Sequence, residues 1–160
     1  MERLREEFVR LVGAYVAAGR KSSRCRLPAD LTPIRKIRSW PLLAPLPWEV
    51  DLTDPEKRLI VYGTLVPGGE YYYLLADLPE ARWEPCLIRG HMGTYLRYPA
   101  FRWNPAGLPY PAWLVTSPGL PRRYPALDRF EGQAYRRRLI AAEAGRRLVA
   151  AYIYESRVRA

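Results

Sequence analysis

One glutamate, Glu131, is spaced so that a helix would carry it on an apolar face. Four residues recur at i, i+4, i+7 and i+11 and so share one side of a predicted helix over 120–131: Leu120, Tyr124, Leu127 and Glu131. Gly132 follows as a helix-ending residue. Partial burial and the negative end of the helix dipole should both raise the pKa of Glu131 toward that of a general acid and base. The alternative is that Glu131 bends into solvent or pairs with Arg137.

A second stretch, Val61 to Leu65, has the features of a backbone cradle. The apolar residues Leu59 to Tyr62 predict a buried strand, and Gly63 is expected to let the chain turn sharply where a side chain would clash. A strand that ends in this way leaves consecutive N–H groups free to point at one spot, which can hold an anion or a carbonyl oxygen. The alternative is an ordinary strand followed by a glycine turn.

Composition argues against several other kinds of site. The chain has 160 residues with 49% hydrophobic content, which suits one domain with a buried core. Two distant cysteines, Cys25 and Cys86, and the single histidine, His91, supply too few ligands for zinc, so we expect no metal. No apolar run is long enough to cross a bilayer and the first ten residues do not resemble a signal peptide. We therefore expect a cytoplasmic protein without a membrane partner.

The net charge of +10 raises the question of nucleic-acid binding. The positive charge is spread over both halves of the chain, with concentrations at Arg20 to Arg38 and in the arginines between positions 136 and 147. A solvated basic face explains this distribution better than a phosphate-binding one. Nucleic-acid association is therefore kept only as a weaker alternative function.

The elements that must position the candidate residues begin with a helix. Residues 1–19 carry an apolar stripe at helical spacing, formed by Leu4, Phe8, Leu11, Val12, Tyr15 and Val16. This stripe packs either on the core of the same chain, which is the commoner case, or on a second copy in a homodimer. Lys21 to Pro55 is rich in proline and arginine, which predicts a linker or an ordered wrap without long regular elements.

After residue 59 the pattern changes to short strands. Strand-like runs occupy residues 59–62, 85–96, 98–103 and 110–116, and two more, 135–142 and 148–154, form a hairpin signal around Gly145. Glu70 to Leu78 is typical of a short helical stretch, whose tyrosines could stack on a ligand or flank the core. The sequence thus predicts a mostly β domain that carries one longer helix over 120–131.

Four motifs, taken in order, resemble the γ-glutamylcyclotransferase-like (AIG2-like) superfamily. They are Val61-Tyr-Gly-Thr-Leu65, Tyr98-Pro-Ala100, Leu127-Asp-Arg-Phe-Glu-Gly132 and Tyr135-x-Arg137, and the closing Ala151-Tyr-Ile-Tyr154 resembles the last strand of that fold. The resemblance covers roughly Leu59 to Ser156 and implies an α+β fold, a small and mostly antiparallel β-barrel with short helices. We therefore divide the chain into an N-terminal helical and proline/arginine-rich extension, 1–58, and a γ-glutamylcyclotransferase-like domain, 59–160.

The resemblance also implies a function: a γ-glutamyl amine or γ-glutamyl peptide cyclotransferase that releases 5-oxoproline and a free amine and needs no metal or cofactor. Its glutamate acid and base corresponds to Glu131. Its γ-glutamyl-binding loop corresponds to Tyr62, Gly63, Thr64 and Leu65. Tyr135 matches the tyrosine that follows the catalytic glutamate and is expected to line the pocket.

One segment departs from the family pattern. Ala112 to Thr116 stands where relatives carry a strand of the type Gly-Glu-Leu-Tyr, so the pocket wall or the packing of that strand should differ. The same fold also occurs in proteins without an assigned substrate, which leaves a non-catalytic module that binds a small ligand as the alternative function.

Overall fold

The structure is a computed structural model that describes residues 9, 10, 12–14, 16, 17 and 49–157. The basic segment Arg20 to Arg38 and the proline-rich stretch up to residue 48 lie outside the described residues. The division of the chain at residues 58 and 59 stays a prediction.

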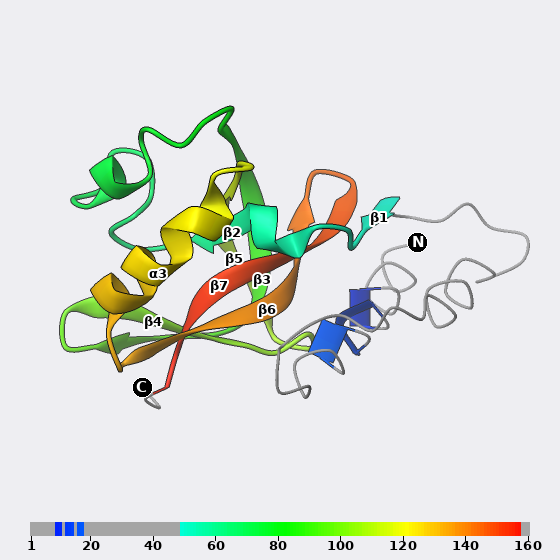
Figure 1. Ribbon diagram of the computed structural model, residues 1–160. Helices are drawn as coiled ribbons and strands as arrows, with labels where there is room; N and C mark the ends of the chain where they lie inside the picture. The colour runs from blue at the N-terminus through cyan, green and yellow to red at the C-terminus, as the bar shows by residue number, and fades with distance from the viewer. Residues whose placement is uncertain (1–8, 11, 15, 18–48, 158–160) are drawn as a thin grey trace, which may run out of the picture.

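Strands are the main regular elements of the described chain (Figure 1). The elements from residue 49 onward are β1 (Glu49–Asp51), the 3₁₀ turn η1 (Pro55–Lys57), β2 (Arg58–Val61), the 3₁₀ turn η2 (Tyr72–Leu74), β3 (Arg82–Tyr95), β4 (Tyr98–Trp103), β5 (Leu108–Thr116), α3 (Leu120–Glu131), β6 (Tyr135–Ala144) and β7 (Arg147–Ser156). The helix predicted over 120–131 is confirmed, whereas the helical stretch expected over 70–78 contains only η2.

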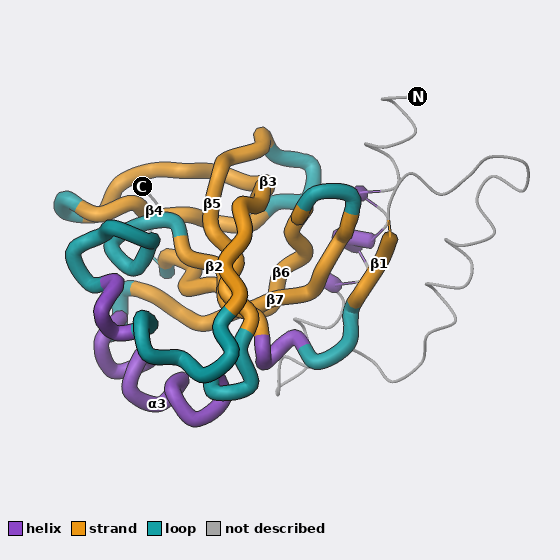
Figure 2. The backbone as a smooth tube through the Cα atoms, turned by 90° about the horizontal axis from the view of Figure 1, so that it is seen from above, coloured by secondary structure: helices purple, strands orange, loops and turns teal. Residues whose placement is uncertain are grey.

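Five of these strands close into a barrel within the described residues. β2 pairs antiparallel with β5 and parallel with β7, and β7 pairs antiparallel with β6 along the predicted hairpin. The ring is completed by β3, which pairs with β5 along most of its length and with β6 at Leu87 and Glu143. β4 pairs antiparallel with the C-terminal part of β3, and β1 pairs parallel with β7. The expected α+β fold, a small and mostly antiparallel barrel, is confirmed (Figure 2).

β2 and most of β7 are buried on both faces, which explains their nearly continuous apolar sequences. On β2, Ile60 points into the barrel interior, while Leu59 and Val61 pack toward α3. On β7, Ile153 likewise belongs to the interior cluster and Tyr154 to the cluster on the α3 side. Because side chains alternate along a strand, one strand can serve two cores at once.

The N-terminal helical residues occupy the other side of the barrel from α3 (Figures 1 and 2). Val9, Val12 and Val16 are buried there. They pack with residues of β6 and β7 and with Leu52, in the cluster that also includes Leu139, Leu148 and Ala150. The described part of the apolar stripe is therefore covered by its own chain, as the core-packing alternative expects. No helix in the described part of the chain is long and apolar enough to span a membrane.

This packing can be tested with two matched substitutions in the same helix. Val16→Asp places a charge at a fully buried position and should lower the free energy of unfolding by about 2 to 4 kcal/mol. Ala14→Asp, at an exposed position, should cost less than about 1 kcal/mol through helix propensity alone. Urea unfolding at two protein concentrations measures both effects. Equal effects of the two variants, or a loss that depends on protein concentration, would contradict packing within one chain.

Candidate active site

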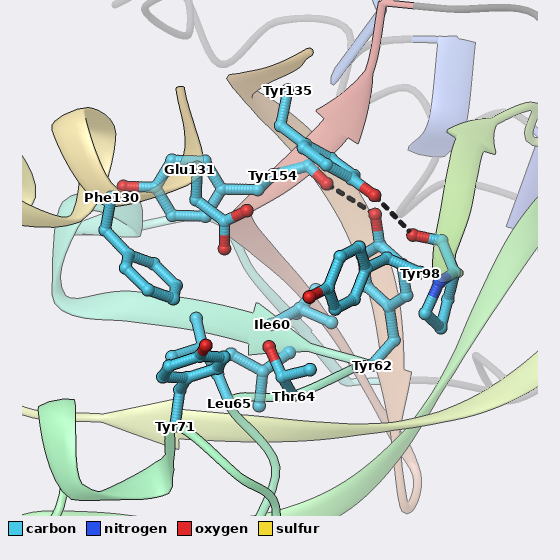
Figure 3. Close-up of a pocket in the computed structure, with 13 residues that line it drawn as sticks. Ile60, Tyr62, Thr64, Leu65, Tyr71, Tyr98, Phe130, Glu131, Tyr135 and Tyr154 are labelled. Carbon is cyan, nitrogen blue, oxygen red and sulfur yellow. Dashed lines mark hydrogen bonds between the residues drawn. The ribbon is translucent and has the colours of Figure 1, made fainter. Parts of the chain in front are cut away.

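A cavity of about 290 Å³ opens between the end of β2, the C-terminal end of α3 and the start of β6 (Figure 3). The structure places all six sequence-predicted site residues around it: Tyr62, Gly63, Thr64, Leu65, Glu131 and Tyr135. The cavity is also lined by Ile60, Val61, Tyr71, Tyr98, Pro99, Phe130 and Tyr154. Two segments about 70 residues apart in the sequence, the loop after β2 and the end of α3, thus face a common space.

Glu131 is the last residue of α3, and its carboxyl group points into the cavity (Figure 3). The helix ends here because Gly132 adopts a positive φ of 71° and donates its N–H to the Asp128 carbonyl at 3.1 Å. Burial raises the pKa of Glu131 to about 7. Among the described residues no side chain forms an ion pair or a hydrogen bond with this carboxylate. Near neutral pH the group therefore exchanges a proton readily, as a general acid and base must.

Arg137 does not pair with Glu131, because another acid on the same helix holds it. Its guanidinium binds Asp128, with Nε 3.0 Å from Oδ1 and a second nitrogen 3.3 Å from Oδ2. The same guanidinium lies over the ring of Tyr124, 4.1 Å from its centroid, and 4.9 Å from that of Tyr152. Asp128 also accepts a hydrogen bond of 2.6 Å from the Tyr154 hydroxyl.

The two carboxylates near the end of α3 consequently differ in acidity. Burial acts to raise the pKa of Asp128, but the hydrogen bonds from Arg137 and Tyr154 outweigh it and the pKa is lowered. Glu131, three residues later, experiences burial without such partners, and its pKa is raised. A pair of acids whose environments push their pKa values apart separates a structural carboxylate from one that can transfer protons.

The loop after β2 uses carbonyl groups internally, whereas its first N–H groups are free among the described residues. The Gly63 carbonyl accepts from Val66 N–H at 3.4 Å, and the Thr64 carbonyl accepts from Tyr71 N–H at 2.9 Å. The backbone N–H groups of Gly63, Thr64 and Leu65 donate to no acceptor in the described part of the chain. Consecutive free donors beside a cavity are suited to hold a carboxylate or a developing oxyanion.

The expectation that a side chain at Gly63 would clash is wrong. Gly63 does not have a positive φ, and an added Cβ would meet only Pro99, at an ordinary contact distance of 3.7 Å. Close packing in this loop requires a glycine instead at Gly69, where a Cβ would lie 2.5 Å from the Thr64 carbonyl oxygen. Sequence alone could not separate the two, because the close contact arises only when the loop folds back on itself.

Tyr62 and Tyr135 hold the cavity walls together through their hydroxyl groups. Tyr62 donates to the Tyr154 carbonyl on β7 at 2.6 Å, and Tyr135 donates to the Pro99 carbonyl on β4 at 2.9 Å (Figure 3). Burial raises the pKa of both hydroxyls. They therefore stay protonated at neutral pH and act as bridges between strands, whereas the raised pKa of Glu131 lies near neutrality.

Several lining residues were not identified from the sequence. Tyr98 lies in a motif that was recognised but given no role, and Phe130 directly precedes Glu131. Tyr71 was considered for stacking on a ligand, and it does line the cavity, whereas Tyr72 packs edge-on against Trp83. Tyr154 lies in the segment that resembles the last strand of the family fold, but the sequence assigns it no role, because that role depends on the distant partner Asp128.

The fold and cavity define a class: a small closed α+β barrel with a partly buried carboxylate facing a loop of free backbone donors. The sequence model of the family described as gamma-glutamyl cyclotransferase, AIG2-like, matches residues 59–160. The chain belongs to this gamma-glutamyl cyclotransferase, AIG2-like family. A comparison with curated proteins finds no match.

Solved structures with similar folds come from several organisms. YkqA from Bacillus subtilis is 22% identical with a TM-score of 0.53, over 63% of this chain and 36% of that protein. An AIG2-like protein from Mus musculus is 18% identical with a TM-score of 0.47, over 65% of this chain and 79% of that one. An uncharacterised protein from Pyrococcus horikoshii is 18% identical with a TM-score of 0.49, over 64% of this chain and 79% of that one. The similarity to YkqA supports the barrel fold.

The different roles of the two loop glycines can be tested by paired alanine substitutions. Gly69→Ala forces a methyl group against the Thr64 carbonyl and should lower the free energy of unfolding by about 1 to 3 kcal/mol. Gly63→Ala should change it by less than about 1 kcal/mol in either direction. Thermal or urea unfolding of both variants measures the difference. A Gly63→Ala variant as unstable as Gly69→Ala would show that position 63 is sterically restricted after all.

The raised pKa of Glu131 predicts a stability change that depends on pH. Below about pH 4.5 the carboxyl is protonated in both the folded and the unfolded chain, so its burial imposes little penalty. As pH rises toward 7, the unfolded chain releases this proton and the folded chain keeps it, so stability falls. Glu131→Gln removes this effect. Relative to the unchanged protein, the variant should gain about 2 to 3 kcal/mol between pH 4.5 and pH 8.

Urea midpoints of both proteins at the two pH values test this prediction. A surface control, Glu49→Gln, should give the same difference from the unchanged protein at both pH values, because Glu49 is exposed. A stability difference for Glu131→Gln that does not vary with pH would mean that the carboxylate is solvated in the folded state.

Proposed function

We propose that this protein is a γ-glutamyl cyclotransferase, which converts a γ-glutamyl amine or γ-glutamyl peptide to 5-oxoproline and a free amine. The single observation that carries the proposal is that Glu131, with a raised pKa and no ion-pair partner among the described residues, lines the same cavity as Gly63 to Leu65, whose backbone N–H groups donate to no acceptor in the described chain. Membership of the family supports the same reaction class.

The proton balance of the reaction requires a group that both accepts and donates protons. The substrate α-ammonium carries three protons and the lactam nitrogen of the product only one, so two protons must leave that nitrogen. The departing nitrogen gains two and leaves as an ammonium group. One carboxylate that cycles between its two forms can carry both protons in turn, and a pKa of about 7 makes both forms available at neutral pH.

The bond changes take place within one substrate molecule. Once deprotonated, the α-amino nitrogen attacks the γ-carbonyl carbon, a C–N bond closes the five-membered ring, and the original amide C–N bond breaks. Because nucleophile and electrophile belong to the same molecule, the cavity needs only to fold the substrate into a reactive geometry. We assign to the backbone N–H groups of Gly63, Thr64 and Leu65 the binding of the substrate carboxylate or of the developing oxyanion.

This proposal predicts that Glu131→Gln abolishes most activity while the fold is kept. Glutamine has nearly the same shape but cannot carry protons, so kcat/KM for 5-oxoproline release should fall by about 10² to 10⁴-fold. In the unchanged protein kcat/KM should rise with pH through about 7, as Glu131 becomes the free base. A coupled assay for 5-oxoproline over pH 5 to 9 measures both effects.

The surface substitution Glu49→Gln serves as the matched control and should keep full activity and the same pH profile. If Glu131→Gln keeps its activity on a substrate that is turned over, Glu131 is not the proton carrier. If calorimetry detects binding of γ-glutamyl compounds but no 5-oxoproline forms, the protein is instead a module that binds the ligand without converting it.

A further inference from the structure

The residues that surround the opening of the cavity form an aromatic rim, which we define as Tyr71, Tyr98 and Phe130. Phe130 is 41% and Tyr98 38% exposed, whereas Leu65 and Tyr154 at the floor are only 4% exposed. Tyr71 and Phe130 pack edge to face with their ring centroids 4.9 Å apart. In Figure 3 these two rings lie to one side of the Glu131 carboxylate and Tyr98 lies to the other.

The volume of the cavity decides which part of a substrate meets this rim. About 290 Å³ is just below the roughly 300 to 1,000 Å³ typical of small-molecule pockets. The γ-glutamyl group must enter deeply enough to reach Glu131 and the loop of Gly63 to Leu65. The departing half of the substrate is then left between the rings of the rim.

Among the described residues that line the cavity, the charged side chain is an acid, Glu131. No arginine, lysine or histidine is among the described residues that line the cavity. Glu131 projects into it, and the charge of Glu70 is the main cause that raises the pKa of the Tyr71 hydroxyl at the rim. Arg97 and Arg129 directly precede the rim residues Tyr98 and Phe130 in sequence and are exposed, but neither lines the cavity.

From this arrangement we propose that the departing amine is aromatic or otherwise apolar and carries no carboxylate next to its nitrogen. The inference rests on the proposed function, since it concerns the leaving half of that substrate. The leaving nitrogen must approach Glu131 to receive its protons. A carboxylate only two bonds away would enter the cavity with it, where it would meet another carboxylate and aromatic rings but no cation among the described lining residues. An aromatic ring in the same place gains edge and face contacts with the rim.

A matched set of compounds tests the inference. γ-Glutamylphenethylamine and γ-glutamylphenylalanine differ only in the carboxylate next to the departing nitrogen, and γ-glutamylethylamine lacks the ring. We expect kcat/KM for γ-glutamylphenethylamine to exceed that for each of the other two by at least about tenfold. Equal values for the phenethylamine and phenylalanine compounds, or a preference for the latter, would overturn the inference while leaving the proposed function intact.

A variant that supplies the missing cation sharpens the test. Phe130→Arg, at an exposed rim position, should lower the ratio of the phenethylamine to the phenylalanine compound by about tenfold, because the new guanidinium can pair with the carboxylate. Leu108→Arg adds the same charge at a position that is 70% exposed and does not line the cavity, so it should leave the ratio unchanged. A ratio that is the same in all three proteins would contradict the role assigned to the rim.

The same compounds distinguish failure of the proposed catalytic function from failure of the inference about the departing amine. If none of the three compounds yields 5-oxoproline, the catalytic proposal is wrong, and calorimetry with the same compounds then decides the inference. Tighter binding of γ-glutamylphenethylamine than of γ-glutamylphenylalanine would support an aromatic rim that excludes carboxylates. Equal binding, or no binding of either compound, would overturn it.

Discussion

The ion pair between Asp128 and Arg137 is the interaction on which the candidate site depends. It joins α3 to β6, while the hydrogen bond from Tyr154 to the same carboxylate joins α3 to β7. The last turn of the helix is thereby held against two barrel strands, and the direction of Glu131 follows from its place three residues later. Because Asp128 engages the arginine charge, the neighbouring glutamate keeps the raised pKa that burial gives it. One acid is thus used for structure so that the other is left available for chemistry.

The barrel gives this helix a rigid surface and also supplies the opposite wall of the cavity. β2 is short, yet its alternating side chains enter both the barrel interior and the cluster beneath α3. The free N–H groups at the end of the strand therefore emerge from a segment that is buried on both faces and paired on both edges. A cradle built on such a strand is pre-organised, whereas one on an exposed loop would have to be ordered by its ligand.

Features that depend on local periodicity could be predicted from the sequence, and those that depend on closure of the barrel could not. The apolar spacing that ends at Glu131 predicts the helix correctly up to its last residue. Three buried positions in two turns define one face of a helix, whatever that face packs against. The contributions of Tyr98 and Tyr154 require strands from distant parts of the chain to meet. The sequence predicts a steric clash for a side chain at Gly63, but the clash occurs at Gly69. Only the folded loop brings the Thr64 carbonyl against Gly69. Family membership supplied the pairing of loop and glutamate that periodicity could not.

The hydrogen bond from Tyr62 to the Tyr154 carbonyl joins positions 92 residues apart, and this separation has a consequence for the order of folding. Contacts between such distant residues form slowly, because the entropy of closing a long loop must be overcome first. β7 is the last strand described, yet it lies between β2 and β6 in the barrel. During synthesis the loop and the glutamate therefore emerge from the ribosome well before the strand that brings them together. The cavity is completed only when β7 inserts, so a chain interrupted before that point would contain all six predicted site residues without possessing a site.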